Sequence, residues 1–218
     1  MIRIEQVILD LDGPLLDGRQ RHYKCYSDIL FRHGHTPLPI ETYWHLKRSR
    51  KSRKEQLSLS GAEPIYDLFL GEWLNRIETP EYLQLDRLQK GALKQLRVWR
   101  AFGRRVILVT MRSSRKHLMH QLQTTGIFPN LDDVVICKHA DGGGGKAKQL
   151  LQDIPEIDPR SCIWIGDTEA DFDASRYLAC PACLLSNGLR EREFLASLEP
   201  EFLKGDITQV NLNEIENN

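Results

Sequence analysis

The residues best suited to chemistry in this chain are two aspartates near its N-terminus. Asp10 and Asp12 stand at the end of a short apolar run, residues 7–11, and Gly13 and Pro14 follow at once. Gly and Pro interrupt regular structure, so the run predicts a buried strand that gives way to a loop at the aspartates. Side chains that are separated by one intervening residue, such as those of Asp10 and Asp12, point to the same face while a strand lasts. A cation or several hydrogen-bond donors must then offset the repulsion and lost hydration of the two carboxylates, although Asp and Gly are also common in turns.

A second acidic cluster follows another apolar run much later in the chain. Residues 161–165 lead into Gly166 and then into Asp167 and Asp171. Helical patterns lie between the two acidic clusters. Open α/β sheets bind ligands at the carboxyl ends of their strands. The two clusters therefore predict one site with oxygen ligands at that edge of a parallel sheet.

The elements that must position these carboxylates alternate between two kinds of pattern. Apolar, β-rich runs predict strands, and amphipathic spacing predicts helices. This alternation indicates βαβ units, and thus an α/β fold with a Rossmann-like, three-layer core whose parallel sheet carries helices on both faces. Besides the first run, strands are expected at residues 105–110, 133–137, 162–165 and 182–185, and helices at residues 86–102, 117–125, 146–153 and 171–178.

Residues 16–85 interrupt this alternation with a helical pattern of their own. Connections longer than about 12–15 residues without secondary structure are uncommon in compact domains. We therefore expect an inserted all-α cap at residues 16–85, and a catalytic core built from residues 1–15 and 86–218. An insertion directly after the first strand suits a lid over the acidic site.

Composition limits the classes of protein to consider. The chain has 218 residues, is 41% hydrophobic, and balances 30 basic against 30 acidic residues, so bulk charge does not attract a partner. Apolar runs stay well short of the ~20 residues that span a bilayer, and the first residues do not resemble a signal peptide. The five scattered cysteines fit a reducing compartment. We expect a cytoplasmic protein without a membrane partner.

Taken in order, four segments resemble the motifs of the haloacid dehalogenase-like hydrolase superfamily, in its phosphatase branch with an α-helical cap after the first strand. The run into Asp10 and Asp12 is similar to the first motif, and residues 106–110, ending in Thr110, are similar to the second. Lys146, at the start of a helix, resembles the third, and residues 166–171 resemble the fourth. The resemblance spans nearly the whole chain.

This resemblance implies roles for the acidic residues. Asp10 would be the nucleophile that forms an aspartyl-phosphate. Its carboxylate, the Asp12 backbone carbonyl and the Asp167 carboxylate would bind Mg²⁺, and Asp171 would orient this metal-binding shell. Asp12 would protonate the leaving alcohol and then activate water. Because a halide leaves without a proton, the presence of Asp12 favours phosphoryl transfer over carbon–halogen cleavage.

The resemblance also implies roles for groups around the phosphate. Thr110 would donate its hydroxyl to the phosphoryl oxygens, and Lys146 would pair with Asp10 and the phosphate. Lys138 and Lys148 compete for the role of Lys146, and Lys138 lies just past a strand, where other branches of the family place this residue. Arg112 and Ser113 are further candidates for phosphate or substrate contact, since an arginine fork suits phosphate. Gly142 to Gly145 are interpreted as a flexible connection into the helix.

One basic segment lies within the expected cap. Lys47 to Lys54 are rich in Lys and Arg. A solvated helix face is the simplest interpretation, and contact with a nucleic acid is an alternative. Arg53 or Lys54 could instead select an anionic substrate. Only the folded cap can decide between these interpretations.

The sequence thus predicts a Mg²⁺-dependent phosphatase that hydrolyses a small phosphorylated metabolite, with the cap closing over the site to exclude water. A phosphomutase of the same family, which passes the phosphoryl group to a sugar, is one alternative. A nucleic-acid-binding module that uses the basic cap segment is another. The complete set of Asp10, Asp12, Lys146 and Asp167 argues against a purely binding role.

Overall fold

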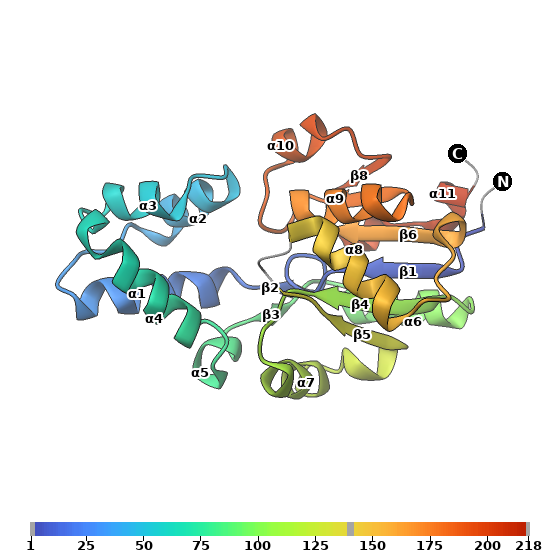
Figure 1. The fold of residues 1–218 in the computed structure, drawn as a ribbon, viewed down its shortest axis with the longest axis horizontal. Helices are drawn as coiled ribbons and strands as arrows, with labels where there is room; N and C mark the ends of the chain where they lie inside the picture. Colours follow the sequence, from blue (N-terminus) through green and yellow to red (C-terminus); the bar gives the residue numbers. More distant parts are fainter. Residues whose placement is uncertain (1–2, 139–141, 217–218) are drawn as a thin grey trace. The chain divides into compact units, whose positions relative to one another are not determined.

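A six-stranded sheet organises the larger part of the chain. The computed structural model describes residues 3–138 and 142–216 (Figure 1). The strand order is β5-β4-β1-β6-β7-β8, and every pairing between these strands is parallel, which confirms the predicted α/β fold. The strands are β1 (Gln6–Leu9), β4 (Arg105–Thr110), β5 (Asp133–Ile136), β6 (Cys162–Gly166), β7 (Ala182–Leu185) and β8 (Phe202–Lys204).

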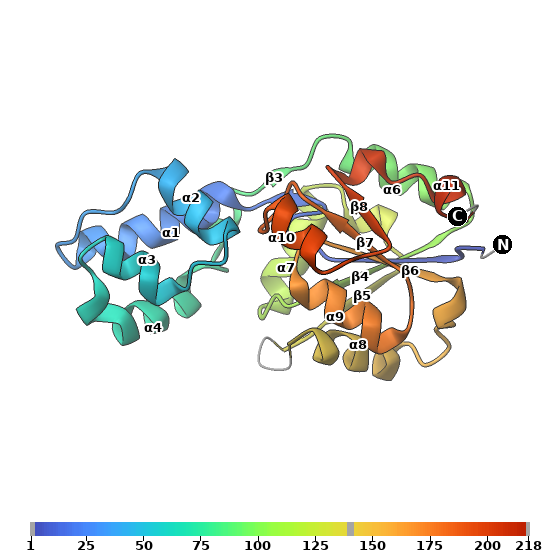
Figure 2. The same ribbon diagram turned by 90° about the horizontal axis from the view of Figure 1, so that it is seen from above.

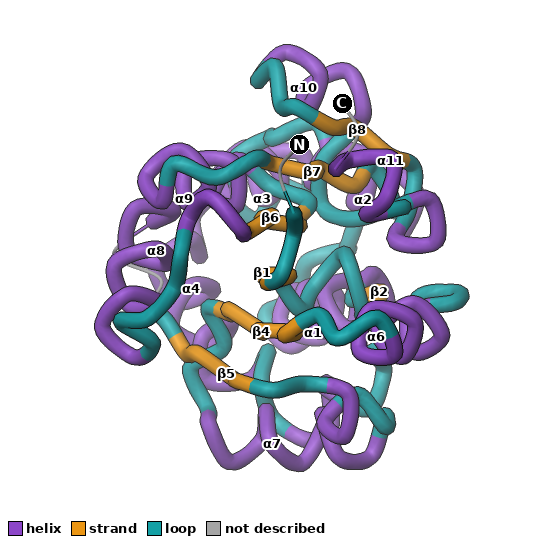
Figure 3. Tube along the Cα trace, turned by 90° about the vertical axis from the view of Figure 1, so that its right-hand side faces the viewer, coloured by secondary structure: helices purple, strands orange, loops and turns teal. Residues whose placement is uncertain are grey.

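Alternate residues of the central strands enter two separate hydrophobic cores. Val7 and Leu9 belong to one core, and Ile8 belongs to the other, on the opposite face of the sheet. The first core includes apolar side chains of α6 (Ala92–Ala101), α7 (Arg115–Thr124) and α11 (Leu212–Glu216), and the second includes those of α8 (Gly142–Asp153) and α9 (Glu169–Leu178). The helices therefore cover both faces (Figures 2 and 3). Burial on both faces explains why the strands read as continuous apolar runs.

Some predicted boundaries differ from the structure. The helix expected from residue 86 begins only at Ala92, because Arg87–Leu88 form β3, which pairs with β2 (Leu16–Asp17) in a two-stranded ribbon. Gly91, with φ of 77°, precedes the helix in the left-handed region, which glycine adopts readily. Strand β8 was not predicted, because three residues are too short a run to show a period. The short helix α10 (Arg192–Ser197) precedes it.

Contacts divide the chain into two compact units. One comprises Met1–Leu16 and Leu88–Asn218, and the other comprises Asp17–Arg87. The second, helical unit contains α1 (Arg19–Arg32), α2 (Ile40–Arg48), α3 (Arg53–Leu59), α4 (Tyr66–Arg76) and α5 (Pro80–Leu83).

The helical unit has its own core, which is rich in aromatic side chains. The rings of Tyr26 and Tyr43 stack at 4.4 Å, and those of Phe69 and Trp73 at 5.7 Å. Such pairs stabilise a small core beyond the area they bury. Within the described part of the chain, helices fall short of the length and apolar character needed to cross a membrane.

Candidate active site

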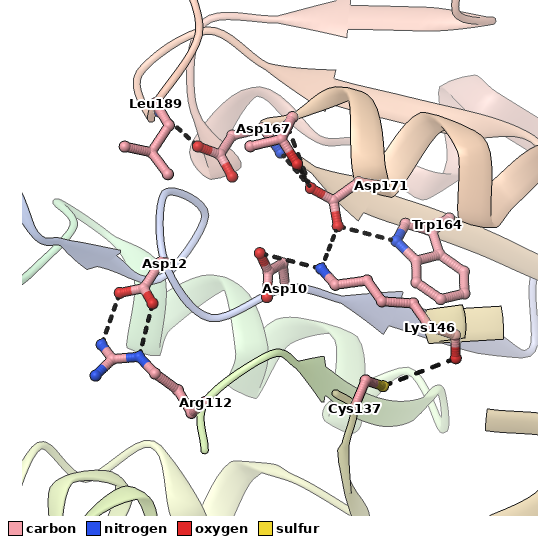
Figure 4. A network of polar contacts seen from close by, with 10 residues as sticks. Asp10, Asp12, Arg112, Cys137, Lys146, Trp164, Asp167, Asp171 and Leu189 are labelled. Atoms are coloured by element: carbon pink, nitrogen blue, oxygen red, sulfur yellow. Dashed lines mark hydrogen bonds and ion pairs between the residues drawn. The ribbon is translucent and has the colours of Figure 1, made fainter. Parts of the chain in front are cut away.

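Asp10 stands at the carboxyl edge of the central strand. The backbone N–H of Asp10 donates to the Ile165 carbonyl at 3.0 Å, which continues the ladder one residue past β1. The chain then turns at Gly13, whose φ is 97° and whose N–H donates to the Leu16 carbonyl. The expected strand was therefore two residues too long at its C-terminal end. Asp10 and Asp12 do not share a strand face, and each contacts a different cation (Figure 4).

Lys146 forms the centre of a buried charge network with Asp10 and Asp171. Its ammonium lies 3.2 Å from Asp10 Oδ2 and 2.7 Å from Asp171 Oδ1. Lys146 is only 1% exposed, whereas Lys138 and Lys148 are both exposed. Of the three candidate lysines, the structure brings Lys146 to Asp10.

The glycine run before Lys146 is the first turn of α8. The interpretation of Gly142 to Gly145 as a flexible connection was therefore wrong. The physical reason is close packing against α9: a Cβ at Gly143 would lie 2.3 Å from the Ala170 carbonyl oxygen and 2.6 Å from Asp173 Cβ. Glycine lets the backbones of the two helices approach. This approach helps to bring Lys146 of α8 against Asp171 of α9.

Asp171 is fixed by hydrogen bonds to both of its carboxylate oxygens. Its Oδ2 accepts from the Thr168 hydroxyl at 2.7 Å and from the backbone N–H groups of Asp167 and Thr168, both at 3.2 Å. Its Oδ1 accepts from Lys146 and, at 3.4 Å, from the Trp164 indole. With Thr168 as N-cap, this is a capping box that starts α9. Asp171 is thus held in place by the helix terminus.

Asp167 has a different environment, with one oxygen that lacks a donor. Its Oδ2 accepts from the Leu189 N–H at 2.5 Å. Its Oδ1 is buried and accepts no hydrogen bond from any residue that the structure describes. Glycines surround the carboxylate, since a Cβ at Gly13 would lie 2.2 Å from its Cγ and one at Gly188 would lie 2.0 Å from its Oδ2. A buried carboxylate oxygen of this kind is satisfied by a proton, a cation or a bound water.

The carboxylates fit a divalent metal ion. One oxygen of each of Asp10, Asp167 and Asp171 lies within 4.8 Å of the others. Hard divalent cations such as Mg²⁺ are bound by oxygen ligands of this type. The donor set, together with the unpartnered oxygen of Asp167, makes this edge of the sheet a candidate metal centre.

Burial and like charges shift the pKa values of these groups. Burial raises the pKa of Asp10 to about 7; Lys146 opposes the rise, while Asp171 and Asp12 add to it. Burial also raises the pKa of Asp167, and the charges of Asp171 and Asp10 raise it further. For Lys146, burial lowers the pKa, but the two neighbouring carboxylates outweigh this effect and the net shift is upward. The site therefore holds more negative charge than one ammonium compensates, and a cation would reverse these shifts.

The remaining predicted residues of this unit lie on the neighbouring strand end. Thr110, 1% exposed, is the last residue of β4, which pairs with β1. Arg112 follows in the loop, and its Nε and Nη2 donate to Asp12 Oδ2 and Oδ1, each at 2.7 Å. Ser113 precedes Ser114, the N-cap of α7. The fork of Arg112 thus contacts Asp12, a partner that the sequence did not suggest.

Arg53 and Lys54 belong to the helical unit. The Arg53 guanidinium lies 4.8 Å from the centre of the Trp73 ring. Lys54 pairs with Glu63 at 3.4 Å and is largely exposed. The basic segment is not one solvated helix face, because Lys47 and Arg48 end α2 while Arg53 begins α3. Nothing in this arrangement supports binding of a nucleic acid.

Sequence reasoning missed three features of the site. These are the Arg112–Asp12 pair, the Trp164 indole that contacts Asp171, and the glycines packed against the carboxylates. The Asn187-Gly188 turn was a visible signal for one of these glycines. Nothing in the alternation of β6 distinguishes Trp164 from an ordinary core residue.

One comparison with known proteins identifies a family. The family model described as haloacid dehalogenase-like hydrolase matches residues 4–178. No curated protein matches the chain significantly.

Solved structures share the fold at low sequence identity. A haloacid dehalogenase-like family hydrolase from Streptococcus pneumoniae superposes with a TM-score of 0.79 at 15% identity, covering 97% of this chain and 98% of its own. A predicted phosphatase from Clostridium acetobutylicum gives 0.75 at 14% identity, covering 99% and 97%. A predicted phosphoglycolate phosphatase from Haemophilus somnus gives 0.75 at 16%, covering 99% of both chains.

Proposed function

The chain belongs to the haloacid dehalogenase-like hydrolases, and we propose that within this family it is a Mg²⁺-dependent phosphatase of small phosphate monoesters. One observation carries the proposal: a half-buried strand-end aspartate, Asp10, contacts a buried lysine and lies within a cluster of three carboxylates. Metal ligands, a nucleophile and a counter-charge are thereby gathered at one sheet edge.

In the proposed reaction, Asp10 attacks the phosphorus of the ester. A bond forms between its carboxylate oxygen and phosphorus, and the bond from phosphorus to the alcohol oxygen breaks. Asp10 and Asp167 would hold Mg²⁺ with the Asp12 backbone carbonyl, and Asp171 would orient this group. When bound, the metal ion would offset the repulsion between the carboxylate and the phosphate and stabilise charge on the transferring oxygens.

Asp12 transfers the protons in both steps of this proposal. It gives a proton to the departing alkoxide, and then accepts one from the water that attacks the aspartyl-phosphate. This second step releases inorganic phosphate and restores Asp10. The Lys146 ammonium, 3.2 Å from Asp10 Oδ2, and the Thr110 hydroxyl would stabilise the phosphoryl oxygens.

We assign the selection of the substrate to the helical unit, which would act as the cap. Arg53 supports this assignment, because its guanidinium stacks on Trp73 and has no carboxylate partner among the residues that the structure describes. Burial lowers the pKa of Arg53, so the charged form is incompletely solvated. A second anionic group of the substrate would compensate that charge. The solved relative named as a predicted phosphoglycolate phosphatase is consistent with a small, doubly anionic ester.

The test is a screen of the purified protein against phosphorylated metabolites, with Mg²⁺ and with a chelator. We expect Mg²⁺-dependent release of inorganic phosphate. In Asp10→Asn this release should be lost, whereas the matched variant Asp153→Asn, at an exposed position at the end of α8, should retain it. Absence of turnover on every ester would contradict the proposal. Conversion of a sugar phosphate to its isomer without phosphate release would indicate a phosphomutase instead.

A further inference from the structure

Arg112 and Asp12 form a bidentate ion pair between two strand ends. Both oxygens of Asp12 accept from the same guanidinium, each at 2.7 Å. The Arg112 side chain is 5% exposed and the Asp12 side chain 21%. Arg112 is therefore the buried member of the pair and Asp12 the accessible one. Bidentate pairs of this type fix the plane of the carboxylate as well as its position.

The loop that carries Arg112 is anchored at both ends. It leaves β4 at Thr110, and it enters α7 at Ser114, whose hydroxyl accepts from the His117 N–H at 3.3 Å. The Nε and Nη2 atoms, which form one of the two forks of the guanidinium, both donate to Asp12 (Figure 4). An arginine held in this way is suited to orient its neighbour.

We propose that Arg112 is a positioning residue that aims the Asp12 carboxyl group at the leaving oxygen, rather than a ligand of the transferred phosphate. The inference rests on the proposed function, in which Asp12 delivers a proton as the bond from phosphorus to the alcohol oxygen breaks. A carboxyl group that rotates away from the leaving oxygen loses this transfer, because small misplacements of catalytic groups cost large factors in rate.

Leaving groups separate the two roles of Arg112. A phenolate is a strong base and needs the proton, whereas a 2,4-dinitrophenolate departs without one. The ratio kcat/KM reports the steps up to the first irreversible one, here the transfer to Asp10. Loss of a phosphate ligand would lower this quantity by the same factor for both esters. Loss of an oriented acid would lower it mainly for phenyl phosphate.

The experiment measures kcat/KM of Arg112→Met for phenyl phosphate and 2,4-dinitrophenyl phosphate. General acid catalysis contributes about 10²–10⁴-fold, so we expect a loss of about that size on the phenyl ester and below about 10-fold on the dinitrophenyl ester. Asp12→Asn should show the same asymmetry, and the double variant should show little further loss. Arg112→Lys, which retains the charge but not the fork, should fall between. Partial misfolding of Arg112→Met would lower both rates equally and leave their ratio unchanged.

Arg105→Met is the matched control. Arg105 begins the same strand that Thr110 ends, and it also pairs with carboxylates, at 2.8 Å from Asp133 and 3.0 Å from Glu156. This variant should keep the wild-type ratio between the two esters. An equal loss on both esters in Arg112→Met protein that circular dichroism shows to be folded, no loss, or a gain on phenyl phosphate would overturn the inference. A tenfold weaker inhibition by inorganic phosphate would do the same.

Failure of the proposed function gives a different result. If the wild-type protein hydrolyses both esters and Asp10→Asn hydrolyses neither, the proposed function stands whatever Arg112→Met shows. If the wild type hydrolyses neither these two esters nor any ester of the metabolite screen, the proposed function and the inference are overturned together.

Discussion

The charged side chains at the two edges of the parallel sheet differ in how exposed they are. At the amino edge, Arg105 pairs with Asp133 and Glu156, and all three side chains are at least 28% exposed. At the carboxyl edge, the side chains of Lys146 and Asp171 are 2% and 0% exposed, and Asp10 is 13% exposed. Exposed pairs contribute little to stability, whereas burying unequal numbers of opposite charges is costly. The charge arrangement at the carboxyl edge therefore lowers stability, and it is the arrangement that the proposed nucleophile and metal site would need.

The strongest way to break this comparison is Asp10→Asn. We expect a loss of turnover of at least about 10³-fold, since a carboxamide cannot act as the nucleophile. In metal-free protein, the same change should raise the melting temperature, because it removes one of three clustered carboxylates. Calorimetry and phosphate release measure the two effects. A variant that lost activity and stability together would contradict the idea that this edge is electrostatically strained.

Lys146→Met should lower the free energy of unfolding by more than Arg105→Met does at the other edge. Removing one partner of a buried charge network costs about 3–5 kcal/mol, because Asp10 and Asp171 lose their shared cation. Arg105→Met should cost less than about 1 kcal/mol, as is typical of exposed pairs. Urea denaturation of both variants, at the same pH and without metal, gives the comparison. Equal costs would show that burial does not distinguish the two networks.

The pH dependence of the stability of the metal-free protein should reflect the same electrostatic repulsion among the carboxylates. The pKa of Asp10 is raised from 3.8 to about 7 in the folded state. The folded state therefore binds more protons than the unfolded state between these values, and the free energy of unfolding should fall as pH rises from 3.8 to about 7.

Mg²⁺ should reverse this fall. Near neutral pH we expect added Mg²⁺ to stabilise by about 2.7 kcal/mol at 100 times its dissociation constant. Thermal melts across pH, with and without Mg²⁺, measure both effects. The fall in the free energy of unfolding per pH unit should be smaller in Asp10→Asn. An unchanged fall in that variant would show that other groups cause the pH dependence.

The close approach of α8 and α9 can be tested with a pair of glycines. Gly143→Ala should destabilise by about 1–3 kcal/mol, since its Cβ would overlap the Ala170 carbonyl. At Gly144, a Cβ would meet only Tyr177 Cδ2, at 3.8 Å, so Gly144→Ala should instead stabilise, by about 0.5–1 kcal/mol. Denaturation midpoints of the two variants should therefore move in opposite directions. A shift in the same direction would mean that the packing is looser than the structure indicates.

The smallest expected effect concerns the helical unit. Arg53→Met should raise KM for phosphoglycolate about tenfold, which corresponds to about 1.4 kcal/mol, and should change KM for ethyl phosphate by less than about twofold. Lys54→Met is the control, because Lys54 is exposed and already paired with Glu63. If Arg53→Met changed KM by the same factor for both esters, the guanidinium would not be binding a second anionic group.

The sequence was sufficient where local pattern determines structure. Apolar runs located β1, β4, β5, β6 and β7 to within two residues, because strands buried on both faces leave little other interpretation. Asp10 and Asp167 could be placed together because parallel strands end at one edge. The end of β1 was misplaced, since Leu11 is as apolar as the strand residues before it and only the turn at Gly13 stops the ladder.

The sequence could not predict features that depend on contacts between distant residues. Arg112 and Asp12 are 100 positions apart, and nothing local marks either as the partner of the other. The glycine run looked flexible because glycine propensity is the local signal, whereas packing against Ala170 decides its conformation. Strand β8 has three residues, too few for alternation to be visible. Tertiary contacts determine all three features.

The position of β1 in the sheet has a consequence for synthesis. Its first residue, Gln6, pairs with Arg105 on one side and Cys162 on the other. On the ribosome, this apolar segment emerges before either neighbouring strand has been translated, whereas the hydrophobic core of the helical unit is built from residues within 17–87. The central strand must therefore wait for β4, which ends at residue 110, before it has one neighbour, and for β6, which ends at residue 166, before it has both. Nascent chains of this topology expose an aggregation-prone segment early, and chaperones that bind such segments should engage the chain around β1.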